Sequence, residues 1–162
     1  MSAIFIFSAL LLAISAAHKL NDRKRMAVSV ANIAGTSEFY GLLLFLLSGV
    51  IEAIAALALL LPGLHHLGGY MAAALWVVYS AALLRRYGQT LDCGCDLRFI
   101  EKPVGLFVIA RPLILAALVL AVTTTVPLAW TGEAVFAAIA MLSLYFAASE
   151  LAAISPRTLG TM

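Results

Sequence analysis

Residues 39–61, FYGLLLFLLSGVIEAIAALALLL, decide the fold class of this chain, because Glu52 is the one charged side chain in the stretch. About 20 mostly apolar residues are enough to cross a hydrocarbon layer about 30 Å thick. Backbone N–H and C=O groups find no water inside that layer, so a crossing segment satisfies its own hydrogen bonds by forming a helix. The stretch therefore predicts a transmembrane helix.

Four further stretches have the same character, and they are residues 1–17, 67–84, 104–122 and 130–149. Residues that end or start helices separate them, such as Pro62-Gly63 after the second span and Pro127 before the last. No repeat, charged block or Pro-rich linker divides the chain. We therefore predict an all-α integral membrane bundle of about five transmembrane helices, forming one domain over residues 1–162.

The composition agrees with this prediction and excludes several other classes of protein. The chain is 64% apolar and 11% charged, and its mean hydropathy is +1.08, values outside the range of soluble globular domains. A secreted disulfide scaffold, a disordered tail and a Rossmann or P-loop enzyme are excluded. The net charge of +2 also argues against a nucleic-acid partner. The expected surrounding is a lipid bilayer.

The segment between the first two spans, residues 19–37, is harder to place. Its apolar part, residues 26–34, is too short to cross a membrane, so we expect it to lie along the interface or to re-enter in part. Residues 1–17 have no basic residue ahead of their apolar part, which argues against a cleavable signal peptide.

The distribution of basic residues predicts the orientation, because Lys and Arg in short loops resist translocation. If all five spans cross, nine of the ten basic residues fall on one face: Lys19, Arg23, Lys24, Arg25, Arg85, Arg86, Arg98, Lys102 and Arg157. We therefore expect a multi-pass protein of a bacterial plasma membrane, with its N-terminus outside. The same count places the loop 85–102 at the cytoplasmic face.

This loop contains the two cysteines of the chain, in the sequence Asp92-Cys93-Gly94-Cys95. A disulfide between them requires a tight turn, which Gly94 permits, and the small ring would be strained. Strain and access suit a bond that is repeatedly made and broken. Cys93 and Cys95 are therefore expected to be a redox pair, with soft-metal ligands or inert thiols as the alternatives.

Ionisable residues inside the spans are the other candidates, because a charge at that depth usually faces the bundle interior and marks a functional path or a pair. Glu52 lies in the second span, Tyr79 in the third and Arg111 in the fourth. Glu52 and Arg111 are expected to pair, with two alternatives: each holds helices together separately, or Glu52 is protonated. Glu52 is also a candidate proton acceptor. Tyr79 and Arg111 would stabilise a thiolate or bind a quinone ring oxygen.

His18 and Lys19 close the first span. With the groups above they could line a cavity for a quinone head or for a partner's thiols, and the alternative is an interfacial pair that reaches toward water. His65-His66 is expected to be a solvated pair in a turn, because a zinc site would need about four ligands in all.

These residues together resemble one family. His18-Lys19, Glu52, Tyr79, the Asp92–Cys95 motif and the following Arg111 are similar to the MauE family of methylamine utilisation membrane proteins, which is related to DoxX-like redox-associated proteins. The resemblance covers roughly residues 10–125. The chain departs from the family pattern after the motif, where Asp96-Leu97 replaces Phe-Gly, and after the intramembrane arginine, where Pro112 replaces Asn.

The resemblance implies a four-helix DoxX-like core and a thioredoxin-like partner. It implies further that Cys93 and Cys95 are the redox-active pair in the maturation of methylamine dehydrogenase, whose disulfide-rich small subunit matures in the periplasm. The charge count places the thiols at the opposite face. The leading hypothesis is a membrane thiol–disulfide oxidoreductase subunit.

Two other classes of function are open at this point. In the first, a transporter of a soft metal ion, Cys93 and Cys95 would be ligands, with Glu52 and the histidines along the path. In the second, a non-catalytic subunit would dock another membrane or thioredoxin-like protein. The many small residues allow close helix contacts within one chain or in a homo-oligomer.

Overall fold

The computed structural model describes residues 2–21, 23–91, 102–125 and 128–154. Eight elements follow one another in that part of the chain: α1 (Ser2–Asn21), α2 (Arg23–Ala34), α3 (Glu38–Leu60), α4 (His65–Leu84), β1 (Thr90–Leu91), β2 (Lys102–Pro103), α5 (Leu106–Thr123) and α6 (Gly132–Ile154).

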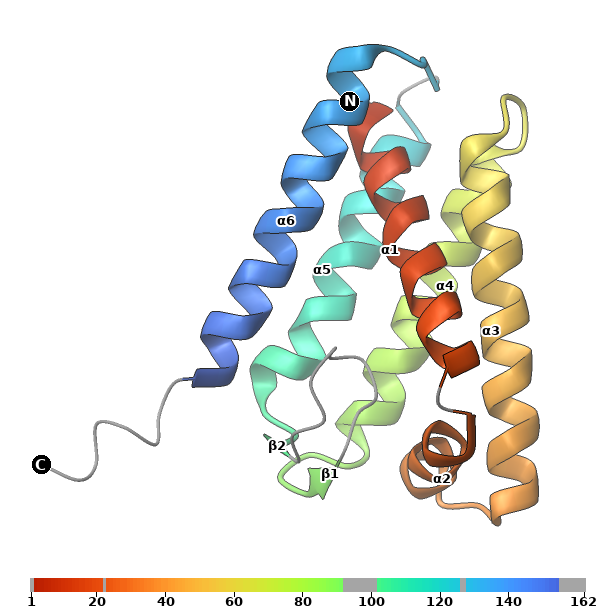
Figure 1. The fold of residues 1–162 in the computed structure, drawn as a ribbon, viewed down its shortest axis with the longest axis vertical. Coiled ribbons are helices and arrows are strands. Elements are labelled where there is room, and N and C mark those ends of the chain that lie inside the picture. The colour runs from red at the N-terminus through yellow and green to blue at the C-terminus, as the bar shows by residue number, and fades with distance from the viewer. Residues whose placement is uncertain (1, 22, 92–101, 126–127, 155–162) are drawn as a thin grey trace, which may run out of the picture.

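Five of the described helices, α1, α3, α4, α5 and α6, are long and apolar enough to cross a membrane. The prediction of an all-α membrane bundle with five spans is therefore confirmed. The helices run side by side (Figure 1), with the N-terminus and the α3–α4 turn at one end and α2, β1 and β2 at the other. We call the second end the loop end, because the segment that carries the cysteines starts and finishes there.

Helix α1 occupies the middle of the bundle and packs against α3, α5 and α6. Phe5 and Leu12 of α1 are fully buried, together with Leu59 of α3 and Val119 of α5. Alanines such as Ala55 and Ala72 fill the contacts between these larger side chains, and small residues of this kind let helix backbones approach closely in a membrane. The hydrophobic core therefore surrounds α1.

The outer faces of the long helices are strongly apolar. On α3 the exposed side chains include Leu43, Leu47, Val50 and Leu57, which are more than half exposed. On a soluble protein such a surface would promote aggregation, but it suits contact with lipid tails. The exposed faces thus support the membrane setting independently of helix length.

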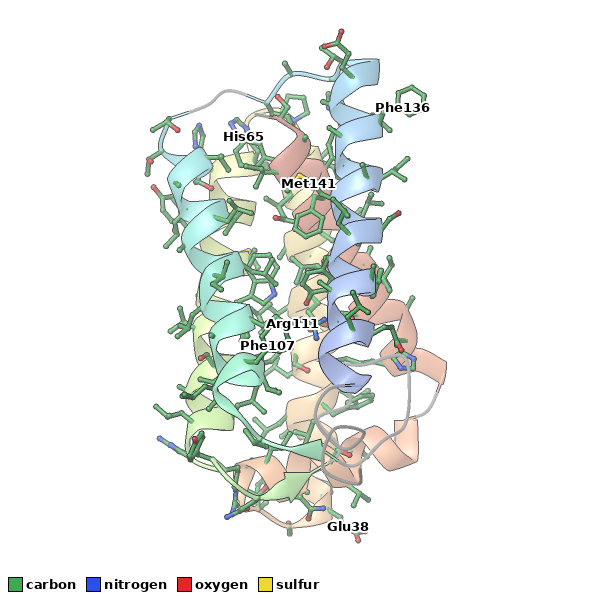
Figure 2. The ribbon with its side chains drawn as sticks, turned by 90° about the vertical axis from the view of Figure 1, so that its left-hand side faces the viewer. Glu38, His65, Phe107, Arg111, Phe136 and Met141 are labelled. Carbon is green, nitrogen blue, oxygen red and sulfur yellow. The ribbon has the colours of Figure 1, made fainter. Side chains whose placement is uncertain are left out.

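The short apolar segment after the first span forms α2, which lies across the loop end instead of parallel to the other helices (Figures 1 and 2). At 12 residues it is about 18 Å long and cannot span a bilayer. Ala27 and Ala31 of α2 are buried against α3, where a Cβ at Gly41 would come within 2.5 Å of the Ala31 side chain. Close packing thus holds α2 against the start of α3.

A short antiparallel ladder joins the two ends of the cysteine-containing segment. Thr90 pairs with Pro103 and Leu91 with Lys102, and the Val104 N–H donates to the Gln89 carbonyl at 2.9 Å. Val104 is 1% exposed. Both ends of the segment 92–101 are therefore anchored to the bundle through β1, β2 and Val104.

Candidate functional site

A buried ion pair joins α1 to α3 in the interior of the bundle. The Lys19 Nζ atom lies 2.8 Å from Glu52 Oε1, and the two side chains are 16% and 1% exposed. Burial of two charges is costly unless the partners and their remaining hydrogen bonds are well matched. The surrounding contacts therefore show how this pair is tolerated.

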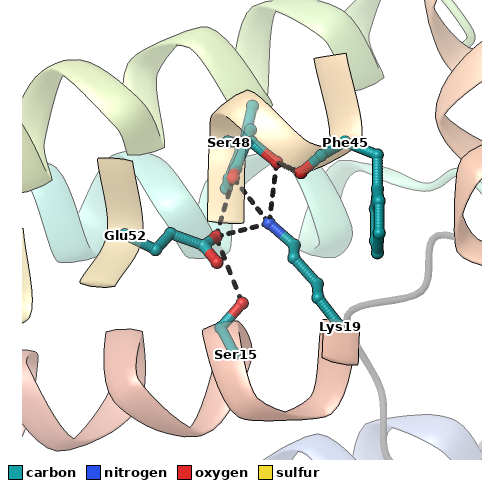
Figure 3. A network of polar contacts seen from close by, with 6 residues as sticks. Ser15, Lys19, Phe45, Ser48 and Glu52 are labelled. Carbon is teal, nitrogen blue, oxygen red and sulfur yellow. Dashed lines mark hydrogen bonds and ion pairs between the residues drawn. The ribbon is translucent and has the colours of Figure 1, made fainter. Parts of the chain in front are cut away.

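The Lys19 ammonium has three hydrogen-bond partners, drawn from two helices (Figure 3). It donates to Glu52 Oε1, to Ser48 Oγ at 3.0 Å and to Tyr79 Oη at 3.0 Å. A lysine ammonium has three N–H donors, so each one has an acceptor. Ser48 in turn donates to the Phe45 carbonyl at 2.8 Å, which completes this side of the network.

Glu52 receives all its hydrogen bonds on one oxygen. Tyr79 Oη donates to Glu52 Oε1 at 2.7 Å and Ser15 Oγ donates to it at 3.2 Å, in addition to the bond from Lys19. Oε2 is buried and has no hydrogen-bond partner. Lys19, Glu52 and Tyr79, which we call the polar cluster, thus connect α1, α3 and α4 at a single carboxylate oxygen.

Helical spacing explains how these side chains meet. Ser15 and Lys19 are four residues apart on α1, and Ser48 and Glu52 are four apart on α3, so each pair lies on one helix face. The Lys19 side chain passes beside Gly49 of α3, where a Cβ would lie 3.8 Å from the Lys19 Cδ atom, an ordinary contact distance. Sequence analysis singled out Lys19, Glu52 and Tyr79 but missed Ser15 and Ser48, although this spacing was visible.

The structure differs from one of the two arrangements expected for Arg111. Glu52 pairs with Lys19 and not with Arg111. Arg111 extends from α5 toward α6 (Figure 2), where its Nε donates to Tyr145 Oη at 2.5 Å and its guanidinium lies 4.3 Å from the centre of the Tyr145 ring. Phe7 packs edge-on against the same ring. Tyr145 was not among the residues that the sequence analysis singled out.

Lys19 does not occupy the second of its two expected positions, at the membrane interface with its side chain reaching toward water. Helix α1 ends well above the loop end, and α2 fills the space beneath it (Figure 1). Lys19 therefore turns into the bundle, beside the partly buried His18. The three donors of the Lys19 ammonium are already bonded to Ser48, Glu52 and Tyr79, so this ammonium as it stands does not fit a quinone ring oxygen.

Of the two adjacent histidines, His65 is buried, which differs from the expectation, whereas His66 is exposed. His65 is 7% exposed at the start of α4, packs edge-on against Phe5, and neither of its ring nitrogens has a hydrogen-bond partner. His66 Nδ1 lies 2.7 Å from the Thr123 carbonyl oxygen. Among the described residues, no three His, Cys, Asp or Glu side chains come together as a metal site.

Cys93 and Cys95 lie outside the described residues, in the segment between β1 and β2. The structure does describe the residues that precede this segment, from the end of α4 onward. Arg86 donates from Nε to the Ile33 carbonyl of α2 at 3.1 Å, and Arg85 and Tyr87 are exposed at the loop end. The turn between α4 and β1 is thus attached to the end of α2.

Residues 1–129 match the family model of the methylamine utilisation protein MauE. The chain belongs to the MauE family. The match covers most of the chain and ends before α6. It confirms the family resemblance, whereas the further likeness to DoxX-like proteins stays an expectation.

Two relatives of this MauE family member carry the name methylamine utilization protein MauE. The one from Paracoccus denitrificans is 31% identical, over 94% of this chain and 87% of its own length. The one from Methylophilus methylotrophus is 34% identical, over 94% of this chain and 85% of its own length. No solved structure matches the chain. The family and the five apolar helices together identify a multi-pass membrane protein.

Proposed function

We propose that this MauE family member is a membrane thiol–disulfide oxidoreductase subunit of methylamine utilisation, in which Cys93 and Cys95 exchange electrons with a thioredoxin-like partner. Its family supports the pathway, because two relatives at 31% and 34% identity are methylamine utilization proteins. The observation that carries the redox role is the anchoring of the cysteine-containing segment, whose two ends pair through β1 and β2 at one end of the bundle.

The proposed exchange is a two-step thiol–disulfide reaction. A thiolate of a reduced partner attacks one sulfur of the Cys93–Cys95 disulfide, the S–S bond breaks, and the other cysteine leaves as a thiolate. The second thiol of the partner then attacks the mixed disulfide. The partner leaves oxidised and the Cys93/Cys95 pair holds the two electrons and, after protonation, two protons. A client that contains a disulfide reverses the same steps and regenerates the pair.

The anchored loop end suits this reaction for a physical reason. A mixed disulfide forms only when three sulfur atoms come into line, so the attacked pair has to be presented at a defined place. Val104, just after β2, is buried and bonds to Gln89, just before β1, which fixes both ends of the segment. Exposed Arg85 and Tyr87 leave the adjacent surface open to a partner.

Tyr79 and Arg111 enter this proposal as groups that hold the bundle together. The Tyr79 hydroxyl is engaged by Lys19 and Glu52, and Arg111 Nε is engaged by Tyr145. In the proposal both groups are also the ones that would stabilise a developing thiolate of the Cys93/Cys95 pair. Glu52 stays in the proposal as a proton acceptor.

Trapping of the mixed disulfide tests the function. Cys93→Ser and Cys95→Ser each leave one thiol, which can join a partner but cannot be released by its neighbour. We expect one of the two variants to accumulate a covalent complex that reductant dissolves. The double Ser variant is a cysteine-free control, because the chain contains two cysteines. If the double variant supports methylamine utilisation as well as the native chain does, the redox role is wrong.

The face of the membrane requires a separate experiment. We propose that the cysteines lie at the cytoplasmic face of a bacterial plasma membrane, because nine basic residues fall on that side of the predicted topology. An impermeant maleimide should then label Cys93 and Cys95 in inverted vesicles after reduction, but not in sealed right-side-out vesicles. Labelling confined to right-side-out vesicles would reverse the orientation without touching the redox proposal.

A further inference from the structure

The side chain of Arg86 covers the end of α2. Its Nε atom donates to the Ile33 carbonyl at 3.1 Å, and a Cβ at Gly35 would lie 2.7 Å from its Nη2 atom. The last carbonyls of a helix have no partner within the helix and attract a cation. Gly35 directly follows α2 and has a φ of +69°, and its lack of a side chain lets the guanidinium approach. Two separate features thus fit Arg86 to this helix end.

The backbone around Arg86 is bonded to the other side of the cysteine-containing segment. The Gln89 N–H donates to the Arg86 carbonyl at 3.1 Å, and the Val104 N–H donates to the Gln89 carbonyl at 2.9 Å. The Gly88 N–H donates to the Val104 carbonyl at 3.0 Å. The turn 85–89 continues into β1, which pairs with β2. We call this turn and the two strands the stem, because they hold both ends of the cysteine-containing segment.

The stem and α2 are packed into different parts of the bundle. Leu83, Val104 and Ile109 form a small apolar cluster of their own, which holds the stem on α4 and α5. Ala27 and Ala31 of α2 are buried against α3 instead. The Arg86 side chain therefore joins two units with separate packing. Loss of its contact would leave each unit folded but would release the position of the stem relative to α2.

We propose that Arg86 is a positioning residue for thiol–disulfide exchange at Cys93 and Cys95. It holds the stem against α2, so that a protein that docks on the loop end meets the cysteine-containing segment at one place. The inference rests on the redox function proposed above. Arg86 acts through its contacts with Ile33 and Gly35 and not on the sulfur atoms directly.

A protein dithiol and a small dithiol make different demands on this position. A small dithiol needs access to the disulfide and can approach it from many directions. A protein has to fit its surface to the loop end while its thiolate comes into line with both sulfur atoms, and a misplacement of about 1 Å in such an arrangement can cost about 100-fold in rate. The exposed end of α2 adjoins the stem at the Arg86–Ile33 contact, so both belong to the surface that a protein meets. Loss of the contact should therefore slow the protein and not the small dithiol.

Reduction of the disulfide in lipid nanodiscs, by thioredoxin and separately by dithiothreitol, tests the proposal. The thiols released with time are counted from the gel shift that a maleimide polymer causes. Arg86→Gln removes the bond to Ile33, and Gly35→Ala forces a Cβ against the guanidinium while keeping its charge. We expect thioredoxin to reduce both variants about tenfold more slowly than the native chain, and dithiothreitol to reduce them at the native rate.

Gly63→Ala is the matched control for backbone strain. Gly63 also has a positive φ, of +88°, but a Cβ there would meet nothing within 4 Å. It lies in the α3–α4 turn, at the opposite end of the bundle from the stem. Thioredoxin should reduce this variant at the native rate.

The other patterns overturn the inference. Slowing in Arg86→Gln but not in Gly35→Ala would show that Arg86 acts through its charge. Equal slowing with both dithiols would show a change in access or in the disulfide itself, and native rates in both variants would show that the contact has no effect on exchange. If Arg86→Gln does not fold, the rate of Gly35→Ala decides. Failure of the redox function is a different result, because the native chain itself would then release no thiols to thioredoxin.

Discussion

Removal of one partner of the Lys19–Glu52 pair should cost much more than removal of both. Lys19→Met keeps most of the side-chain length but removes the ammonium, which leaves the Glu52 carboxylate with Tyr79 and Ser15 as its donors. An uncompensated buried charge of this kind costs about 3–5 kcal/mol of the free energy of unfolding. Glu52→Gln keeps an acceptor for Lys19 and leaves a cation that is partly exposed, so we expect about 2–3 kcal/mol.

The double variant contains no buried charge at this place. Replacement of a whole buried ion pair by neutral groups of similar shape is close to neutral, and we expect a loss of about 1–2 kcal/mol because Ser48 and Tyr79 also lose a donor. The two single losses, about 5–8 kcal/mol together, then exceed the double loss by about 3–7 kcal/mol, which is the coupling energy between the side chains.

Unfolding of the four proteins by SDS in mixed micelles, followed by circular dichroism, measures these differences. Glu38→Gln is the matched control, because Glu38 is exposed in the first turn of the same helix and its loss should cost no more than about 1 kcal/mol. Single losses that add within about 0.5 kcal/mol would mean that the pair is not coupled and would refute this reasoning.

Three further substitutions test the packing around the site. Gly68→Ala places a Cβ 2.5 Å from the Leu59 backbone nitrogen and should destabilise the bundle by about 1–3 kcal/mol in the same assay, whereas Gly132→Ala meets nothing within 4 Å and should be neutral or slightly stabilising. Tyr145→Phe removes the acceptor of Arg111 Nε and should cost about 1–3 kcal/mol; an equal loss in Tyr70→Phe, at an exposed ring, would show that the Arg111 contact is unimportant. Arg86→Gln removes the bond to the Ile33 carbonyl, so amide hydrogen exchange in α2 should become about tenfold faster, corresponding to about 1.4 kcal/mol, whereas Arg85→Gln makes the same charge change at an exposed residue and should leave α2 unchanged.

The five spans could be predicted because hydropathy is a local property. A run such as residues 39–61 exceeds the length needed to cross a bilayer whatever its neighbours are, and the structure places α3 within one residue of that range at each end. The helix α2 was only partly predictable. Its apolar residues showed that it could not cross, but its direction depends on contacts with Gly41 and Arg86, which come from other helices.

For the polar cluster, the sequence determined the residue types and the approximate depth, because charged side chains in a bilayer are costly and rarely incidental. It could not determine the pairing. Sequence analysis considered Arg111 as the partner of Glu52, whereas the structure pairs Glu52 with Lys19 and brings Arg111 to Tyr145. That choice depended on where α1 ends relative to α3.

The amino-acid sequence by itself thus determined a helical membrane protein, its family and the residues that bear charge inside it. Only the tertiary structure decided that Lys19 turns inward to Glu52, that Arg111 binds Tyr145, and that one carboxylate oxygen accepts three bonds while the other accepts none. The physical reason is the distance along the chain over which each effect is decided. Burial in lipid follows from the composition of each segment alone, whereas a hydrogen bond requires atoms of separate helices to lie within about 3 Å, and helix packing sets that distance.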